Sequence, residues 1–176
     1  SGLNLNGSLT NNGAVNFTSV GNFTDINVNG AQTINGTGAI NLSNTSANRI
    51  YGTGATLTLG SGQTLQGSGQ IGVTAGFALV NGGTVIATQG TPLLINAAAG
   101  VTNTGTLRAD GGTLQLQTTV NSGGGAIEAR NGSQVQLLDG TVINNASFSA
   151  TGVGSLITTT SGALVTLGGG TVAGPL

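Results

Sequence analysis

Apolar and polar residues alternate along short stretches of this chain, and the same short pattern returns at a nearly constant spacing. The segments TLRAD and AIEAR show it clearly, because aligning them places Leu107 on Ile127 and Ala109 on Ala129. Alternation with a period of two is typical of a β-strand that has one buried face. We therefore expect these four residues to point inward and the residues between them to face solvent.

The intervening positions carry opposite charges in the two segments. Arg108 falls on Glu128, and Asp110 falls on Arg130. Stacked strands would bring each acid beside an arginine, so we predict a surface ion-pair patch that fixes the register more than it adds stability. A catalytic pair made by Asp110 and Glu128 is an alternative, since glycosidases use two carboxylates, and contact with a polar ligand is another. The ion-pair interpretation explains all four residues and is preferred.

The repeat extends over the whole chain and predicts the fold. Each copy spans about 19 to 24 residues, which indicates a solenoid or an array. A copy contains three short apolar runs separated by Gly, Asn, Ser or Thr, so three strands and three tight corners would form one coil of a parallel β-helix. About eight coils spaced by the usual strand separation are expected, in an all-β, right-handed parallel β-helix. The copies are Leu9 to Ala31, Gln32 to Gly54, Ala55 to Gly76, Phe77 to Gly100, Val101 to Thr119, Val120 to Gly140 and Thr141 to Gly162.

Partial copies occupy both ends, so we expect residues 1–176 to be a single β-helix segment of a longer repeat protein. One coil cannot bury its apolar face alone, and the core must therefore be shared between neighbouring coils. This sharing predicts columns of inward residues. The expected columns are Val85, Leu107, Ile127 and Phe148; Ala87, Ala109, Ala129 and Ala150; Leu93 or Leu94, Leu114, Val135 and Leu156; and Leu79, Val101, Val120 and Val142.

Asparagines recur at the expected corners. Asn11, Asn81, Asn103 and Asn144 each precede an inward apolar residue by the same interval. Asparagine tolerates a left-handed backbone and hydrogen-bonds neighbouring backbone groups, and both properties suit a stacked turn.

The longest irregular segment, Ser43 to Gly54, is expected to be a loop displaced from its coil. It contains Arg49 and the only tyrosine, Tyr51. If this part of the rod binds anything, these two side chains are the expected contacts, although a ring that simply packs on the rod is the simpler interpretation.

The composition excludes several classes of function. The chain has no Cys and no His, which removes disulfides and zinc sites built from those residues. Only 4% of the residues are charged, the net charge is −1 and lysine is absent, so nucleic-acid binding is not expected. Gly67, Gly69 and Gly72 match the spacing of a dinucleotide-binding loop, but no helix is expected after them. We predict neither a cofactor nor a metal.

Short Asn-x-Ser/Thr sequences are frequent in the N-terminal part of the chain. Such sequons accept N-linked glycans in exported proteins, although many arise by chance in a chain rich in Asn, Ser and Thr. The candidate glycosylation sites are Asn6, Asn16, Asn22, Asn35, Asn41 and Asn44.

The phrases GATLTLGSGQTLQGSGQIGV, GTLRADGGTLQL and GGAIEARNGSQVQL resemble the β-helical stalks of large bacterial surface adhesins. The stronger resemblance is to the filamentous-haemagglutinin-like exoproteins of two-partner secretion, and the next is to the passenger domains of autotransporters. The resemblance implies export through an outer-membrane transporter and a place at the surface of a Gram-negative bacterium or among its secreted proteins. It also implies a structural or adhesive rod that meets a host or surface glycan or protein. A β-helical polysaccharide-binding or polysaccharide-degrading protein is the alternative, and a non-enzymatic rod is expected.

Overall fold

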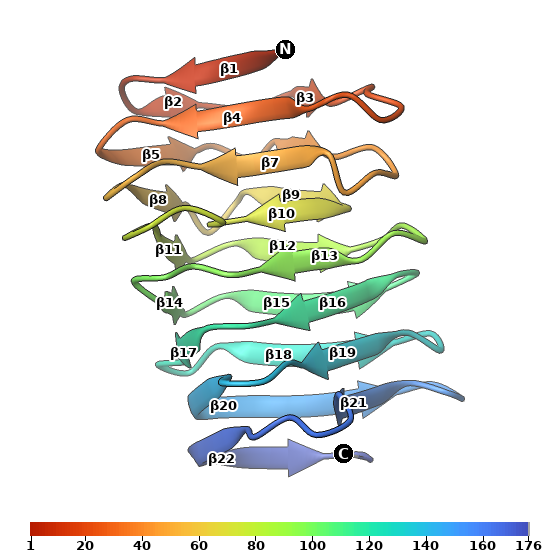
Figure 1. Ribbon diagram of the computed structural model, residues 1–176. Helices are drawn as coiled ribbons and strands as arrows, with labels where there is room; N and C mark the ends of the chain where they lie inside the picture. Colours follow the sequence, from red (N-terminus) through yellow and green to blue (C-terminus); the bar gives the residue numbers. More distant parts are fainter. Residues whose placement is uncertain (176) are drawn as a thin grey trace.

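The computed structural model describes residues 1–175, and this part of the chain is built from strands alone. Parallel strands stack as a β-solenoid of about eight turns, with roughly 22 residues in each coil. In Figure 1 the chain descends while it runs leftward along the near side and rightward along the far side, which is a right-handed winding. The predicted fold class is therefore confirmed. Among the described residues, no helix is long and apolar enough to cross a membrane.

Each coil contributes one strand to each of three faces, so the strands of a face come from successive coils. The first face contains β1 (Gly2–Leu5), β4 (Thr24–Val28), β7 (Asn48–Tyr51), β10 (Gly69–Ile71), β13 (Leu93–Ile95), β16 (Thr113–Leu116), β19 (Gln134–Leu137) and β21 (Leu156–Thr159). The second contains β2 (Leu9–Thr10), β5 (Ala31–Asn35), β8 (Thr56–Leu59), β11 (Ala78–Asn81), β14 (Val101–Asn103) and β17 (Thr119–Asn121). The third contains β3 (Ala14–Asn16), β6 (Ala39–Asn41), β9 (Thr64–Gly67), β12 (Thr84–Ala87), β15 (Thr106–Asp110) and β18 (Ala126–Arg130).

Near the C-terminal end, single strands serve both the second and the third face. The strand β20 (Val142–Thr151) pairs with β17 through its first residues and with β18 through its last. Asn145 lies between these two parts and has a φ of 57°, so the chain turns the corner there. The following strand, β22 (Thr166–Ala173), pairs with β20 along both parts.

The core is the shared interior that the alternating pattern predicts. Leu107 pairs with Ile127, and both side chains are fully buried. Val85 precedes this pair in register and Phe148 follows it, which confirms the first predicted column. The alanine column stands beside it in the predicted register of Ala87, Ala109, Ala129 and Ala150.

The other two columns are confirmed except at their last members. Val135 pairs with Ile157 and not with Leu156, and Val120 pairs with Ile143 and not with Val142. Each error is a shift of one residue within a pair of adjacent apolar residues, where alternation cannot say which of the two points inward. The choice between Leu93 and Leu94 has the same origin, and the structure resolves it in favour of Leu93, which pairs with Leu114.

The corner between the second and third faces combines an inward asparagine with a glycine. Asn103 is buried, and its amide donates to the backbone oxygen of Ala126 on the next coil at 3.3 Å. Gly125 precedes Ala126, and a Cβ at Gly125 would lie 2.4 Å from the Asn103 Nδ2 atom. The missing side chain of this glycine therefore makes room for the amide. Asn81 donates in the same way to Thr106 O at 3.2 Å.

Asn11 repeats this bond by donating to Ala39 O at 3.3 Å. The predicted hydrogen bonding to neighbouring backbone is thus confirmed for Asn11, Asn81 and Asn103. The left-handed backbone is wrong for these positions, because positive φ values at non-glycine residues occur instead at Asn131 and Asn145 among the described residues. Asn144 lies at the corner beside Asn145, as predicted, but its amide donates to a side chain, Asn121 Oδ1 at 2.8 Å, and not to neighbouring backbone.

The prediction that Ser43 to Gly54 is a loop displaced from the coil is wrong. Residues Asn48–Tyr51 form β7, which pairs with β4 on one side and β10 on the other. Asn48 points inward, is fully buried, and donates to Ser43 O at 2.8 Å and Ser68 O at 3.1 Å. A polar residue in an inward position hid the alternation of this strand.

Candidate functional site

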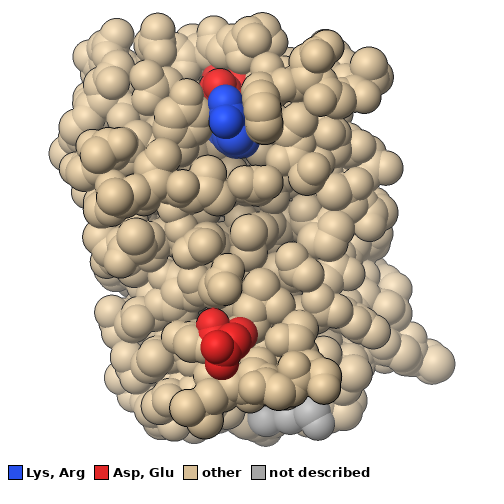
Figure 2. Space-filling model, in the orientation of Figure 1, with Lys and Arg blue, Asp and Glu red and all other residues tan. Residues whose placement is uncertain are grey.

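Four charged or aromatic side chains gather near the N-terminal end of the first face. They are Phe23, Asp25, Arg49 and Tyr51, which we call the aromatic cluster. Asp25 and Arg49 are register partners on β4 and β7, and both are outward positions of their strands. Tyr51 is the next outward residue of β7, while Phe23 immediately precedes β4. Figure 2 shows a face with few charged groups: blue and red atoms meet near its upper end, and one separate red group lies lower down.

The centre of the aromatic cluster is a two-point ion pair. Arg49 Nε donates to Asp25 Oδ1 and Arg49 Nη2 donates to Asp25 Oδ2, each at 2.8 Å. This fork geometry is the strong form of an arginine–carboxylate contact. The hydrogen bonds to Asp25 raise the pKa of the Arg49 guanidinium above its ordinary value, while partial burial acts in the opposite direction. The guanidinium and the carboxylate therefore carry opposite charges, and the pair has no net charge.

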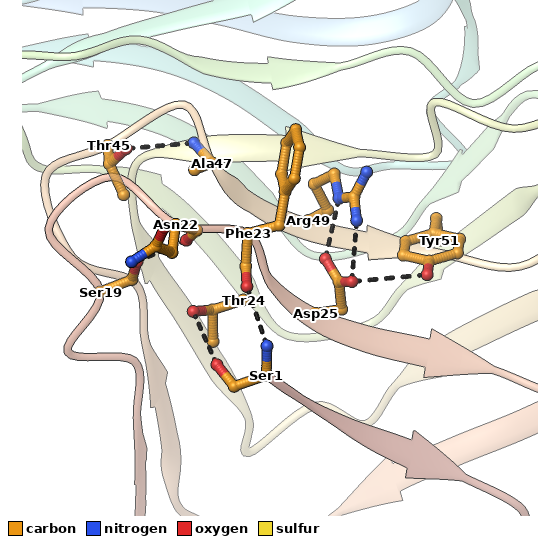
Figure 3. A network of polar contacts seen from close by, with 10 residues as sticks. All are labelled: Ser1, Ser19, Asn22, Phe23, Thr24, Asp25, Thr45, Ala47, Arg49 and Tyr51. Atoms are coloured by element: carbon orange, nitrogen blue, oxygen red, sulfur yellow. Dashed lines mark hydrogen bonds and ion pairs between the residues drawn. The ribbon is translucent and has the colours of Figure 1, made fainter.

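The two rings lie beside the guanidinium group, as Figure 3 shows. Arg49 Cζ is 3.8 Å from the centroid of the Phe23 ring and 5.2 Å from that of Tyr51, both within the range of cation–π attraction. The Tyr51 hydroxyl also lies 3.5 Å from Asp25 Oδ2, at the long limit of a hydrogen bond. Phe23 nevertheless remains 57% exposed.

The structure thus brings together Arg49 and Tyr51, which were expected as ligand contacts, with two residues that were not. Phe23 and Asp25 lie in a different copy of the repeat, so only the register between copies places them beside Arg49. Their position could have been predicted by extending the alignment of the repeat copies to these N-terminal coils.

A shallow cavity adjoins the aromatic cluster on the other side of Asp25. Its volume is about 470 Å³, within the range of small-molecule sites. Ser19, Asn22, Thr24 and Asp25 contribute to its lining, together with residues of β1 and of the turn before β4. In that turn the Ser19 hydroxyl donates to Asn22 O at 2.5 Å. The lining therefore combines hydroxyl and amide groups with the apolar side chains of Leu3, Phe17 and Val20, and it contains one carboxylate that is already paired.

The predicted ion-pair patch lies on β15 and β18 of the third face. Arg108 pairs with Glu128 in register, and Asp110 pairs with Arg130. Glu128 Oε2 accepts from Arg108 Nε at 2.7 Å and lies 3.0 Å from Arg130 Nη2, so one carboxylate serves both arginines. Asp110 instead accepts from Asn131 Nδ2 at 2.8 Å. The register of the four residues is as predicted, but the ion pair expected between Asp110 and Arg130 is not among the salt bridges of residues 1–175.

Each of the four acidic side chains has a hydrogen-bond donor beside it. Asp25 and Glu128 bind arginines, and Asp110 binds an asparagine amide. The fourth, Asp139, accepts from the backbone amide of Leu164 at 2.9 Å. The four acidic side chains are therefore all engaged in contacts within the chain.

The six predicted glycosylation sites differ in how their amides are used. Asn41 Nδ2 donates to Asn16 Oδ1 at 2.7 Å, and Asn41 Oδ1 accepts from Gln66 at 2.8 Å. Asn6 accepts from Asn29, and Asn44 accepts from the amide of Thr91 at 2.9 Å. Asn22 and Asn35 have exposed side chains. Glycosylation at these positions stays a prediction, and Asn41 is the least open of the six, because its side chain is half-buried and its Nδ2 atom already donates a hydrogen bond.

Comparison with known proteins adds no relative. No family model matches the chain, and neither a curated protein nor a solved structure is significantly similar to it.

Proposed function

We propose that this chain is a stiff, non-catalytic segment of an exported fibre at the surface of a Gram-negative bacterium, where it contributes to adhesion. The observation that carries the proposal is one unbroken apolar column through the third face. It contains Val15, Ile40, Leu65, Val85, Leu107, Ile127, Phe148 and Val172. A continuous column couples each coil to the next, and such a stack resists bending while it spans distance.

The outer surface supports a spacer role. Outward amides form hydrogen-bonded ladders between coils, for example from Gln66 through Asn41 to Asn16, and from Gln115 to Gln136 at 2.9 Å. Ladders of this kind link amide groups along the rod axis. They help to fix the register of neighbouring coils without adding charge to the surface. The paired carboxylates described above favour a non-enzymatic rod over a polysaccharide-degrading protein.

Export through an outer-membrane transporter is the step that the adhesin resemblance suggests for this chain. The fold suits that route because the strands of each coil pair with those of its neighbours, so a chain that emerges gradually can add one coil at a time. No cysteine is present, and folding outside the cell would need no disulfide formation.

The test is localisation in the source organism. Antibodies raised against the purified chain should label intact cells or shed fibres, and the label should disappear when the gene of the associated outer-membrane transporter is deleted. A periplasmic enzyme serves as the control for cell integrity. Antigen found only inside lysed cells would contradict the proposal. Release of reducing ends from a polyuronate by the purified chain would instead favour the enzymatic alternative.

A further inference from the structure

The aromatic cluster is unusual because charged and aromatic residues are rare in this chain. The whole sequence contains three basic residues, four acidic residues, four phenylalanines and one tyrosine. One of each of these four kinds meets on adjoining strands at one place, in Phe23, Asp25, Arg49 and Tyr51. Apart from the ion-pair patch on β15 and β18, outward positions of the strands are filled mainly by threonine, asparagine and glutamine. Folding of the rod does not require this concentration, since the core columns are aliphatic apart from a few buried phenylalanines.

The Phe23 ring is only partly used by the fold. The guanidinium group covers it from one side at 3.8 Å, and 57% of the residue still faces water. Figure 3 shows the ring standing beside Arg49 and away from the backbone of β4. An exposed aromatic ring that is held in place by a charged neighbour offers a fixed apolar surface to a ligand.

The charge and the surrounding groups restrict the chemistry of that ligand. Asp25 already neutralises Arg49 through two hydrogen bonds, so the cluster as a unit attracts neither anions nor cations. The groups close by are the phenol of Tyr51 and the amide of Asn27, its register partner, while the amino group of Ser1 donates to the backbone oxygen of Phe23 at 3.1 Å. The cavity on the other side of Asp25 adds the hydroxyls of Ser19 and Thr24.

We infer that the aromatic cluster binds the ring of a neutral pyranose sugar, a site that is separate from the rod function proposed above. A pyranose has one face of C–H groups and a rim of hydroxyls. The C–H face would stack on Phe23, and the hydroxyls would exchange hydrogen bonds with Tyr51 and Asn27. A neutral sugar satisfies both the open ring and the hydrogen-bonding groups of Tyr51 and Asn27, whereas an anionic ligand would meet an arginine that is already paired.

The chain provides its own reporter for this test. Tyr51 is the only tyrosine and tryptophan is absent, so near-ultraviolet fluorescence of the whole protein reports this site alone. Titration with methyl β-D-glucopyranoside should give a saturable fluorescence change with a Kd of about 1–10 mM. Phe23→Ala should raise the Kd at least about tenfold, because the stacking surface is lost. Val153→Ala is the matched control, since Val153 is 99% exposed at a distant corner, and its Kd should equal that of the wild type.

Three outcomes would overturn the inference. The wild-type chain could show no saturation up to about 100 mM sugar, well above the expected Kd. Phe23→Ala could bind as tightly as the wild type while circular dichroism shows both to be folded. Glucuronate could bind more than tenfold more tightly than the methyl glucoside, which would make the site an anion site. If Phe23 only packs on Arg49, its replacement lowers the melting temperature and no sugar titration changes the fluorescence of any variant.

Discussion

Asn81 donates its side-chain amide to the side-chain oxygen of Asn103 on the next coil, over 2.8 Å inside the solenoid. Both residues are fully buried, and the Asn81 Oδ1 atom has no hydrogen-bond partner among the described residues. A buried amide that keeps only some of its hydrogen bonds stabilises through the partners it has and costs free energy through those it lacks.

This geometry predicts strong coupling between the two asparagines. Asn81→Leu or Asn103→Leu alone should lower the free energy of unfolding by about 1–3 kcal/mol, because each leaves a buried polar group of the other residue unpaired. The double variant should cost less than the sum of the single variants. Urea unfolding of all four proteins measures the coupling. Strict additivity would mean that the bond between the two side chains contributes nothing.

Ile127 and Ile86 provide a comparison of the two sides of the third face. Ile127 lies in the core column and is fully buried, while Ile86 pairs in register with the outward residue Arg108. Ile127→Ala should cost about 2–5 kcal/mol of unfolding free energy, because it opens a cavity between packed coils. Ile86→Ala should cost well under half of that. Equal losses in chemical denaturation would show that the assignment of inside and outside is wrong.

Gly125 and Gly123 test the corner beside Asn103. A Cβ on Gly125 would lie 2.4 Å from the Asn103 amide nitrogen and 2.4 Å from its backbone oxygen, whereas a Cβ on Gly123 would meet nothing within 4 Å. Gly125→Ala should therefore lower the melting temperature by several degrees, about 2–4 °C for each kcal/mol lost. Gly123→Ala should leave it unchanged or raise it slightly, because alanine restricts the unfolded chain. Thermal unfolding followed by circular dichroism distinguishes the two, and a destabilised Gly123→Ala variant would contradict the described corner.

Glu128 should matter more than Asp110 although both belong to the same patch. Glu128 contacts two arginines, and Asp110 contacts only an asparagine among these side chains. Glu128→Gln should cost about 0.5–1 kcal/mol at low ionic strength, because it leaves two like charges without their shared partner, and salt should reduce this cost. Asp110→Asn should be close to neutral under the same conditions. Denaturation midpoints at two salt concentrations give the comparison, and a larger effect at Asp110 would reverse the assignment.

The melting temperature should be almost independent of pH between pH 6 and pH 9. Histidine and cysteine, the side chains whose ordinary pKa values lie in or near that window, are absent. Asp25 raises the pKa of Arg49 in the folded chain above its ordinary value. The stability that this cation contributes is therefore fully present below the ordinary pKa of arginine. It would be lost only as the pH rose through the raised pKa of the folded chain, far above this window. A change of more than about 3 °C across the window, equivalent to roughly 1 kcal/mol, would show that another titrating group is coupled to folding and would contradict the prediction.

The sequence was sufficient for the architecture because alternation and repetition constrain each other. Leu107 and Ile127 can be aligned without coordinates, and their pairing then fixes a strand, a face and a neighbour in the next coil. The errors arose where one of the two signals was missing. Adjacent apolar residues such as Leu156 and Ile157 satisfy either register, so the difference between them depends on corner geometry that single-sequence patterns do not contain.

The candidate site was less predictable, since side-chain choice at the surface is not constrained by alternation. Arg49 and Tyr51 stood out as rare residues, but the strand that holds them was obscured by the buried Asn48. Asp110 could be placed beside Arg130 by register, yet its side chain turns to Asn131, because backbone pairing does not determine which of several neighbours a flexible side chain binds.

The repeated register has an evolutionary consequence. Each coil presents to its successor the same three-sided outline that it receives from its predecessor, so duplication or loss of one complete coil leaves compatible partners on both sides of the junction. Gene rearrangement can therefore change the reach of such a molecule in steps of about 4.8 Å without redesigning its interior.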